Sequence, residues 1–206
     1  MTVQEVLQLI KEKGVEWVDF RFVGLSGKAQ HISLPACEVS EETFTNGVAF
    51  DGSSIPGFRG IEQSDMVMLP VPETAFMDPF TQHPTLVMMC DIYTPDGERY
   101  DRDPRGIAQK AEEYLRATGI GTAAYFGPES EFFIFDDVRF SSGMNGSFYE
   151  VDSVEGFWNT GRKEEGGNLG FKVPIKGGYV PVQPTDSQQD IRSEMCNLMM
   201  AAGLRI

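Results

Sequence analysis

The chain has 206 residues, of which 41% are hydrophobic and 23% charged, an ordinary composition for a globular protein of one large or two small domains. Its 31 acidic and 17 basic residues give a net charge of −14, which argues against a polyanion such as nucleic acid or an anionic membrane surface as partner. No signal peptide pattern begins the chain, and no apolar run approaches the about 18 residues of a membrane span. Cys37, Cys90 and Cys196 form no C-x-x-C pair, so we expect buried thiols in a cytoplasmic, reducing compartment.

The first hundred residues predict a small α+β unit. A capping box at Thr2–Glu5 opens its first helix, and Gly14 ends that helix. Caps, alternation and turn residues together predict, in chain order, a helix over 3–13, a strand over 17–23, a turn at 24–27, a return strand over 28–34, a short helix from 40 to 47, and strands over 66–70 and 86–92.

A second helix pattern marks the start of a new unit. Asp103 as N-cap, Pro104 as first helical residue and Gly119 as stop predict a helix over 104–118. Its expected buried face comprises Ile107, Ala108, Ala111, Tyr114 and Leu115. We therefore divide the chain into residues 1–102 and 103–206.

The second unit is less regular in pattern. Strands are expected over 122–126 and 129–136, and a helix over 187–202 with an apolar face containing Ile191 and Met195. Between them, 141–187 is rich in glycine and lacks periodicity, which predicts a long functional loop, held in order by its aromatic residues. The chain ends directly after the last helix, so we expect the domain to continue beyond residue 206.

Two glutamates in the expected strand 129–136 are candidate metal ligands. Side chains on a strand alternate, so Glu129 and Glu131 would share a face with Cα atoms roughly 6.6–6.8 Å apart. Neighbouring carboxylates in so apolar a segment need a cation between them, and Mg²⁺ and Mn²⁺ prefer such oxygen ligands. A half-exposed strand with both glutamates in water fits the spacing equally well.

Two glycine-rich segments carry further candidate site residues. In Phe50–Phe58, Asp51 could hold a cationic or protonated nucleophile with Ser54 hydrogen-bonded beside it, although Asp-Gly-Ser-Ser also describes an ordinary turn. Tyr179, after Gly177 and Gly178, offers a hydroxyl, yet an aromatic residue there is often only packed. No phosphate-binding glycine motif and no Ser/His/Asp or Cys/His arrangement occurs.

Taken in order, four motifs closely resemble bacterial type I glutamine synthetases. These are the segments 50–55 (FDGSSI), 127–133 (GPESEFF), 176–179 (KGGY) and 190–195 (DIRSEM). The resemblance covers the whole chain and implies an α+β fold: a β-grasp N-terminal domain, then the first part of a catalytic domain with an incomplete antiparallel sheet and flanking helices. It also implies a dodecamer of two hexameric rings, with active sites between neighbouring subunits. Residues 141–187 are similar to the loop that β-type members direct toward the central channel.

The resemblance also implies an activity, the ATP-dependent ligation of ammonium to L-glutamate through γ-glutamyl phosphate. Glu129 and Glu131 match residues that give one carboxylate to each of two divalent ions, Mg²⁺ or Mn²⁺. Asp51 matches the aspartate that a neighbouring subunit extends to bind and deprotonate ammonium, and Ser54 and Tyr179 match members of the same pocket.

The nucleotide-binding and glutamate-binding residues and the remaining metal ligands of the family lie later in its chains, so none is expected among these 206 residues. We therefore expect this chain alone to be inactive. A ligase that uses another amine, such as a polyamine, and a short non-catalytic relative that joins full-length rings remain the alternatives.

Overall fold

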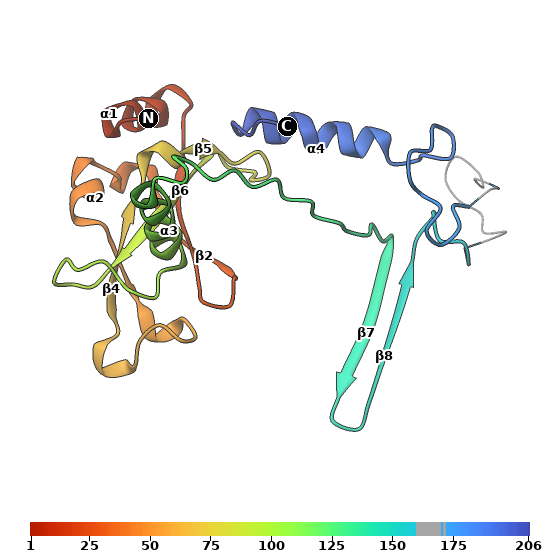
Figure 1. The fold of residues 1–206 in the computed structure, drawn as a ribbon, viewed down its shortest axis with the longest axis horizontal. Coiled ribbons are helices and arrows are strands. Elements are labelled where there is room, and N and C mark those ends of the chain that lie inside the picture. The colour runs from red at the N-terminus through yellow and green to blue at the C-terminus, as the bar shows by residue number, and fades with distance from the viewer. Residues whose placement is uncertain (160–169, 171) are drawn as a thin grey trace. The chain divides into compact units, whose positions relative to one another are not determined.

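The computed structural model describes residues 1–159, 170 and 172–206. Contacts between residues divide the chain into two compact units, which are described separately (Figure 1). The first unit comprises Met1–Phe126 with Ala201–Arg205, and the second comprises Gly127–Met200 with Ile206. The expected division into residues 1–102 and 103–206 stays a prediction.

Sixteen helical or strand elements, four of them short 3₁₀ turns, occur in the described residues. The helices are α1 (Val3–Glu12), α2 (Glu41–Asn46), α3 (Pro104–Thr118) and α4 (Gln189–Ala201). The strands are β1 (Trp17–Val23), β2 (Ala29–Pro35), β3 (Val48–Asp51), β4 (Asp65–Pro70), β5 (Phe76–Met77), β6 (Thr85–Tyr93), β7 (Asp137–Gly143) and β8 (Gly146–Asp152).

The first unit is built on one sheet in the order β2-β1-β6-β4-β3, with β5 paired to β6. β1 and β6 run parallel, and the other pairs are antiparallel. Alternate residues of β1 (Val18, Phe20, Phe22) point into the core, as strand periodicity requires. The arrangement confirms the predicted α+β class and β-grasp domain, although β3 was not predicted as a strand.

Helix α1 covers this core as its pattern predicts. The capping box is formed, since Thr2 Oγ1 accepts from the Glu5 N–H while the Glu5 carboxylate accepts from the Thr2 N–H. Val6 and Ile10, one helical turn apart, are buried in the same cluster as the β1 residues. The predicted α2 also forms and ends at Gly47, whose φ of 73° favours glycine.

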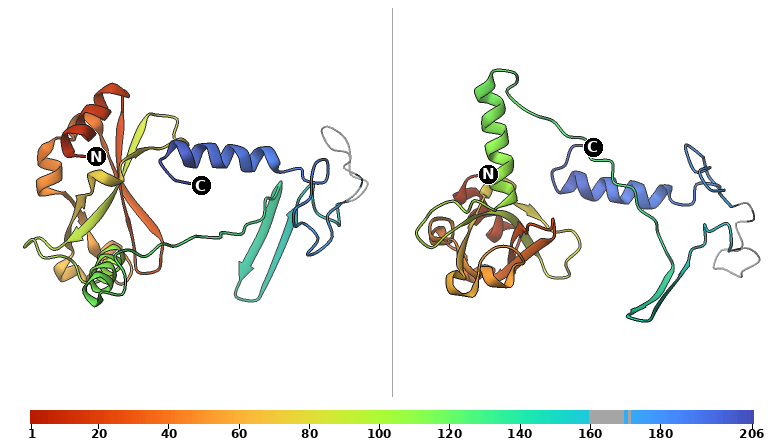
Figure 2. Two further views of the ribbon diagram at one scale, coloured as in Figure 1. Left: turned by 45° about the horizontal axis from the view of Figure 1, so that its top comes forward. Right: turned by 60° about the horizontal axis from the view of Figure 1, so that its bottom comes forward.

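Helix α3 has the predicted ends but not the predicted buried face. Asp103 caps it by accepting from the Arg105 N–H, and Gly119 ends it with φ 71°. Ile107 and Tyr114 are exposed, because within this unit only the N-terminal part of α3 lies close to the sheet (Figure 2, right, green). An amphipathic pattern specifies which face can be covered, but a second surface has to cover it.

The expected strands over 122–126 and 129–136 are wrong. Residues 122–135 carry no strand pairing, and the side chains of 122–135 are exposed. A strand exists only when a neighbour satisfies its N–H and C=O groups, and no described residue pairs with this segment. Residues that favour strands are therefore not sufficient to predict a strand in this segment.

The predicted long loop over 141–187 is also partly wrong, because β7 and β8 form a hairpin at its start. Gly143 pairs with Gly146, which leaves the two-residue loop Met144–Asn145. The aromatic side chains of 141–187 do not hold it on a core, since Tyr149 and Trp158 are exposed. Gly161, Gly166, Gly167 and Phe171, also part of that prediction, lie outside the described residues.

Two further expectations need correction. Helix α4 forms but has no buried residue, so Ile191 and Met195 are not part of a packed face within the second unit. Of the cysteines, only Cys90 is buried, and burial raises the pKa of its thiol to about 12, whereas Cys37 is exposed and Cys196 half-buried.

Among the described residues, no helix combines the length and apolarity that crossing a membrane requires.

Candidate active site

The Asp51 turn, defined as Asp51–Ser54, begins where β3 ends. The Asp51 carboxylate accepts three hydrogen bonds from the following residues. The backbone N–H and the hydroxyl of Ser53 both donate to Oδ1, at 2.8 and 2.6 Å. The Ser54 hydroxyl donates to Oδ2 at 2.9 Å. The structure therefore places the Ser54 hydroxyl against the Asp51 carboxylate, as predicted. The segment is a turn, and the same hydrogen bonds that form the turn also orient the carboxylate, so the two interpretations of the sequence are compatible.

Gly52 fixes this turn to the sheet. Its N–H donates to the carbonyl of Ser64, immediately before β4, at 2.6 Å. Gly52 is buried, and a Cβ added to it would lie 2.3 Å from Sδ of Met66, a core residue that is 1% exposed. Only a residue without a side chain allows this close approach, so glycine at 52 sets the position of the Asp51 carboxylate relative to the core.

The environment of Asp51 keeps its carboxylate ionised. The Ser53 hydroxyl, the Ser53 N–H and the Ser54 hydroxyl hold the pKa of the Asp51 carboxyl below its ordinary value. The side chain is exposed, so a small cation can reach it from solvent. An anionic carboxylate with fixed orientation and open access suits cation binding and proton acceptance.

The chain after the turn is anchored in the core. Phe58 is buried against Phe22 and Tyr100, and the Tyr100 hydroxyl donates to the Phe58 carbonyl at 2.5 Å. The Arg102 guanidinium donates to the Gly57 carbonyl at 3.0 Å. These contacts tie the segment after Asp51 to the segment before α3, which restricts motion of the Asp51 turn.

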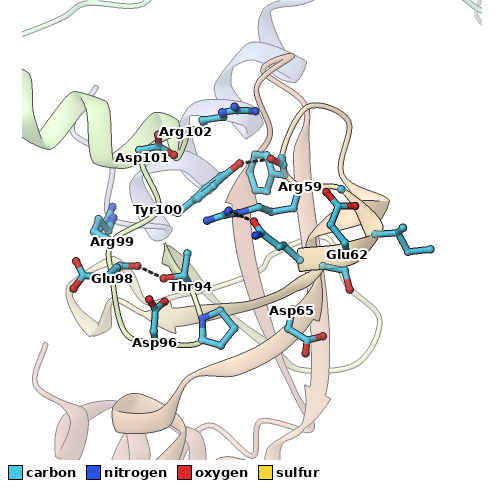
Figure 3. A pocket seen from close by; sticks show the side chains of 16 residues that line it. Arg59, Glu62, Asp65, Thr94, Asp96, Glu98, Arg99, Tyr100, Asp101 and Arg102 are labelled. Atoms are coloured by element: carbon cyan, nitrogen blue, oxygen red, sulfur yellow. Dashed lines mark hydrogen bonds between the residues drawn. The ribbon is translucent and has the colours of Figure 1, made fainter.

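A hollow of about 970 Å³ lies between residues 58–65 and 94–102 (Figure 3). Its charged lining comprises Arg59, Arg99 and Arg102 with Glu62, Asp65, Asp96, Glu98 and Asp101. The Arg59 guanidinium lies over the Tyr100 ring, 5.1 Å from its centroid, and donates to Gln63 at 2.9 Å. Sequence reasoning missed this hollow, because its two walls are separated along the chain and neither has a motif of its own.

Glu129 and Glu131 lie in the second unit, in the segment that forms no strand. Both carboxylates are exposed. Among the described residues, no group of three or more His, Cys, Asp or Glu side chains is placed to hold a metal ion. The pair supplies oxygen donors of the kind that hard divalent ions bind, but too few of them for a complete site.

Tyr179 also lies in the second unit and is exposed. It follows Gly177 and Gly178, and its hydroxyl is open to solvent. The structure thus brings Asp51 and Ser54 together in the first unit, and it leaves Tyr179, Glu129 and Glu131 as accessible side chains of the second.

Family models match nearly the whole chain. The β-grasp domain of glutamine synthetase matches residues 14–95, and the catalytic domain of glutamine synthetase matches residues 101–206. The chain belongs to the glutamine synthetase family. The resemblance inferred from the four motifs is thereby confirmed.

The curated relatives in the glutamine synthetase family include bacterial proteins that share about half of their aligned residues with this chain. Proteins named glutamine synthetase from Vibrio cholerae and Methylococcus capsulatus are each 53% identical over 205 residues, which cover 99% of this chain and 44% of theirs. The chain therefore spans less than half the length of these relatives. A Cupriavidus pinatubonensis protein named 3-hydroxylaminophenol mutase is 50% identical over 206 residues, so identity at this level accompanies more than one named activity.

Solved structures support the fold. A glutamine synthetase of Plasmodium falciparum superposes with a TM-score of 0.77, at 22% identity, over 100% of this chain and 41% of its own. A ligand-free GmaS structure gives a TM-score of 0.60, at 14% identity, over 96% and 40% of the two chains.

The Asp51 turn contains a residue that motif reasoning did not select. Ser53 makes two of the three hydrogen bonds to the Asp51 carboxylate, whereas the motif comparison pointed to Ser54. The sequence carried part of this signal, because an aspartate at the start of a turn commonly accepts from the backbone N–H two residues on, which here is the N–H of Ser53.

Proposed function

We propose that the whole protein to which this chain belongs ligates ammonia to L-glutamate, with ATP converted to ADP and phosphate and γ-glutamyl phosphate as intermediate. Membership of the glutamine synthetase family supports the reaction class. The observation that carries the proposal is the exposed Asp51 carboxylate held by three hydrogen bonds.

The Asp51 turn acts on the attacking amine. The anionic carboxylate raises the local concentration of ammonium and accepts a proton as ammonium becomes nucleophilic ammonia. The Ser54 hydroxyl stays beside Asp51, and Tyr179 provides a further polar contact to the same ion. A lowered pKa of Asp51 keeps the carboxylate ionised where ammonium is the dominant form.

Glu129 and Glu131 would each hold one of two divalent ions, Mg²⁺ or Mn²⁺. Such ions offset the repulsion between the ATP phosphates and the glutamate carboxylate during phosphoryl transfer. Because these residues contribute one ligand per ion, we do not expect the other ligands, the nucleotide site or the glutamate site among these 206 residues.

The assembly proposed for the whole protein is a cytoplasmic dodecamer of two hexameric rings. In it the Asp51 turn of one subunit serves an active site completed by the neighbouring subunit. Its exposed position in the first unit suits such a shared site. We expect residues 1–206 alone to show no synthetase activity.

A chimera tests the proposal without requiring the rest of the native chain. Residues 1–206 replace the matching part of the Vibrio cholerae relative, which is 53% identical. The purified chimera is supplied with L-glutamate, ATP and Mg²⁺ or Mn²⁺, and glutamine and phosphate are measured with and without ammonium. Equal release of both products that requires ammonium supports the proposal, and an assembled chimera that makes no glutamine refutes it.

The same assay separates the alternatives. Putrescine, spermidine and methylamine replace ammonium in parallel reactions. In a separate reaction without ATP or glutamate, 3-hydroxylaminophenol is tested for an isomerised product, because a 50% identical relative is named as its mutase. Product formation with one of these amines but not ammonium would favour a ligase for another amine. A non-catalytic role is favoured if the chimera joins rings of the Vibrio protein but forms no product.

A further inference from the structure

The hydroxyl of Ser53 helps to hold the Asp51 carboxylate and makes the shortest of its three hydrogen bonds, but the function proposed above gives it no part in deciding where ammonium binds. We propose that Ser53 is a positioning residue: it saturates one oxygen of Asp51, so that the oxygen on the Ser54 side receives the ammonium ion. This inference rests on the proposed function, because it concerns the same amine.

The count of acceptor positions supports this assignment. Each carboxylate oxygen accepts about two hydrogen bonds in the plane of the group. Among the residues that the structure describes, Oδ1 accepts two hydrogen bonds, from the N–H and the hydroxyl of Ser53, whereas Oδ2 accepts one, from the Ser54 hydroxyl. One acceptor position therefore remains, on Oδ2, and it lies on an exposed carboxylate.

Ser53 is better fixed than the group it holds. It is half-buried, and its neighbour Gly52 is fixed by the hydrogen bond to Ser64 and by contact with Met66. Two donors from Ser53 hold Oδ1, and together with the Ser54 hydroxyl on Oδ2 they fix the orientation of the Asp51 carboxylate. Geometry set in this way does not have to be created when the ion binds, which favours binding.

Two acidic residues lie on elements that pair with or contact the Asp51 turn. Asp65 of β4 is the residue paired with Asp51 of β3, and Glu62 comes from the 3₁₀ turn that contacts the Asp51 turn. Like charges opposite each other on paired strands repel. Without the Ser53 hydroxyl, the Asp51 carboxylate loses one of the two hydrogen bonds that hold Oδ1 and is freer to rotate.

The test compares Ser53→Ala with Ser33→Ala and Ser53→Thr. Ser33 is a matched control, since its hydroxyl donates at 2.6 Å to the carboxylate of Asp19 on another part of the sheet. In the chimera, Ser53→Ala is expected to raise the KM for ammonium about 3- to 10-fold, with the KM values for ATP and glutamate changed less than about twofold. Ser33→Ala should leave all three values unchanged, and Ser53→Thr, which keeps a hydroxyl, should restore most of the ammonium affinity.

A second readout follows Asp51 itself in the 206-residue chain. Carboxyl-carbon NMR titration should show a higher pKa for Asp51 in Ser53→Ala than in the unsubstituted chain, and no change in Ser33→Ala. In the chimera, the acidic limb of kcat/KM for ammonium should move to higher pH by the same amount.

The outcomes are distinguishable. If the unsubstituted chimera shows no ammonium-dependent synthesis, the proposed function is refuted. The NMR titration alone then tests whether the Ser53 hydroxyl holds the Asp51 carboxylate. With an active chimera, an unchanged ammonium KM in Ser53→Ala overturns the inference. Equal losses for all three substrates, or a lower melting temperature as the only effect, also overturn it, because they indicate a purely structural role.

Discussion

Replacement of Gly52 by alanine tests whether the core positions the Asp51 turn. The new Cβ would lie 2.3 Å from Sδ and 2.8 Å from Cγ of Met66, and 3.2 Å from the carbonyl oxygen of Ser64. Carbon contacts are normally about 3.5–4.0 Å, so either Met66 or the turn must move by more than about 1 Å. Met66 is 1% exposed and surrounded by core residues, which leaves it little space.

The magnitude follows from this overpacking. Forcing an extra methyl group into a packed core typically costs about 1–3 kcal/mol, so Gly52→Ala should lower the free energy of unfolding by that amount. Met66→Ala alone should cost about 2–5 kcal/mol through loss of burial and creation of a cavity. Because Met66→Ala removes both clashing atoms, the double variant should cost at least about 1 kcal/mol less than the sum of the two single variants.

Urea unfolding of the 206-residue chain measures these values. The chain has two tryptophans, so Trp158→Phe leaves Trp17, at the start of β1, as the fluorescent reporter of the first unit. Gly24→Ala is the matched control, because an added Cβ there meets Ile55 at an ordinary 3.5 Å. A Gly52→Ala cost no larger than that of Gly24→Ala, or additive costs in the double variant, would refute the reasoning.

Three further predictions concern the first unit. Burial raises the pKa of Asp19, but hydrogen bonds from Ser33, Arg21 and His31 outweigh it and hold that pKa below its ordinary value. Ionised Asp19 therefore stabilises the fold above about pH 4, and this contribution is lost as the pH falls through its lowered pKa. In Asp19→Asn, the free energy of unfolding from urea titrations should therefore fall less steeply with decreasing pH in this range. Tyr100→Phe removes the hydrogen bond to the Phe58 carbonyl and should cost about 1–2 kcal/mol in the same assay, with no cost indicating that water replaces the hydroxyl. Asp103→Ala should cost at least about 2 kcal/mol, since it removes the α3 cap and one of the two carboxylates paired with Arg99, and retained helicity with unchanged stability would contradict this.

Local signals in the sequence were sufficient for the helices of the first unit. The capping residues Thr2 and Asp103 and the stop residues Gly47 and Gly119 act within one turn of chain, so their effect does not depend on distant partners. β1, β2, β4 and β6 were also predictable, because β1 and β4 alternate in burial and all four are short runs of β-favouring residues bounded by turn or loop residues.

The remaining differences arise where structure depends on a partner. Residues 129–136 have strand composition, but a strand needs a paired neighbour, which no described residue supplies. β7 and β8 were obscured by the many glycines around them, although the turn-forming Asn145 lies in the two-residue loop between them. At the candidate site, the motif identified Asp51 and Ser54, whereas the role of Ser53 required the three hydrogen-bond distances.

The ammonium dependence of Asp51→Ala tests the central claim most directly. In the chimera, its KM for ammonium should rise at least about tenfold, while ATP and Mn²⁺ still bind with affinities within about twofold of the unsubstituted protein. Asp96→Ala, which removes another exposed aspartate in a turn, should behave as the unsubstituted protein. An unchanged ammonium KM in Asp51→Ala, or loss of Mn²⁺ or ATP binding in its place, would contradict the account.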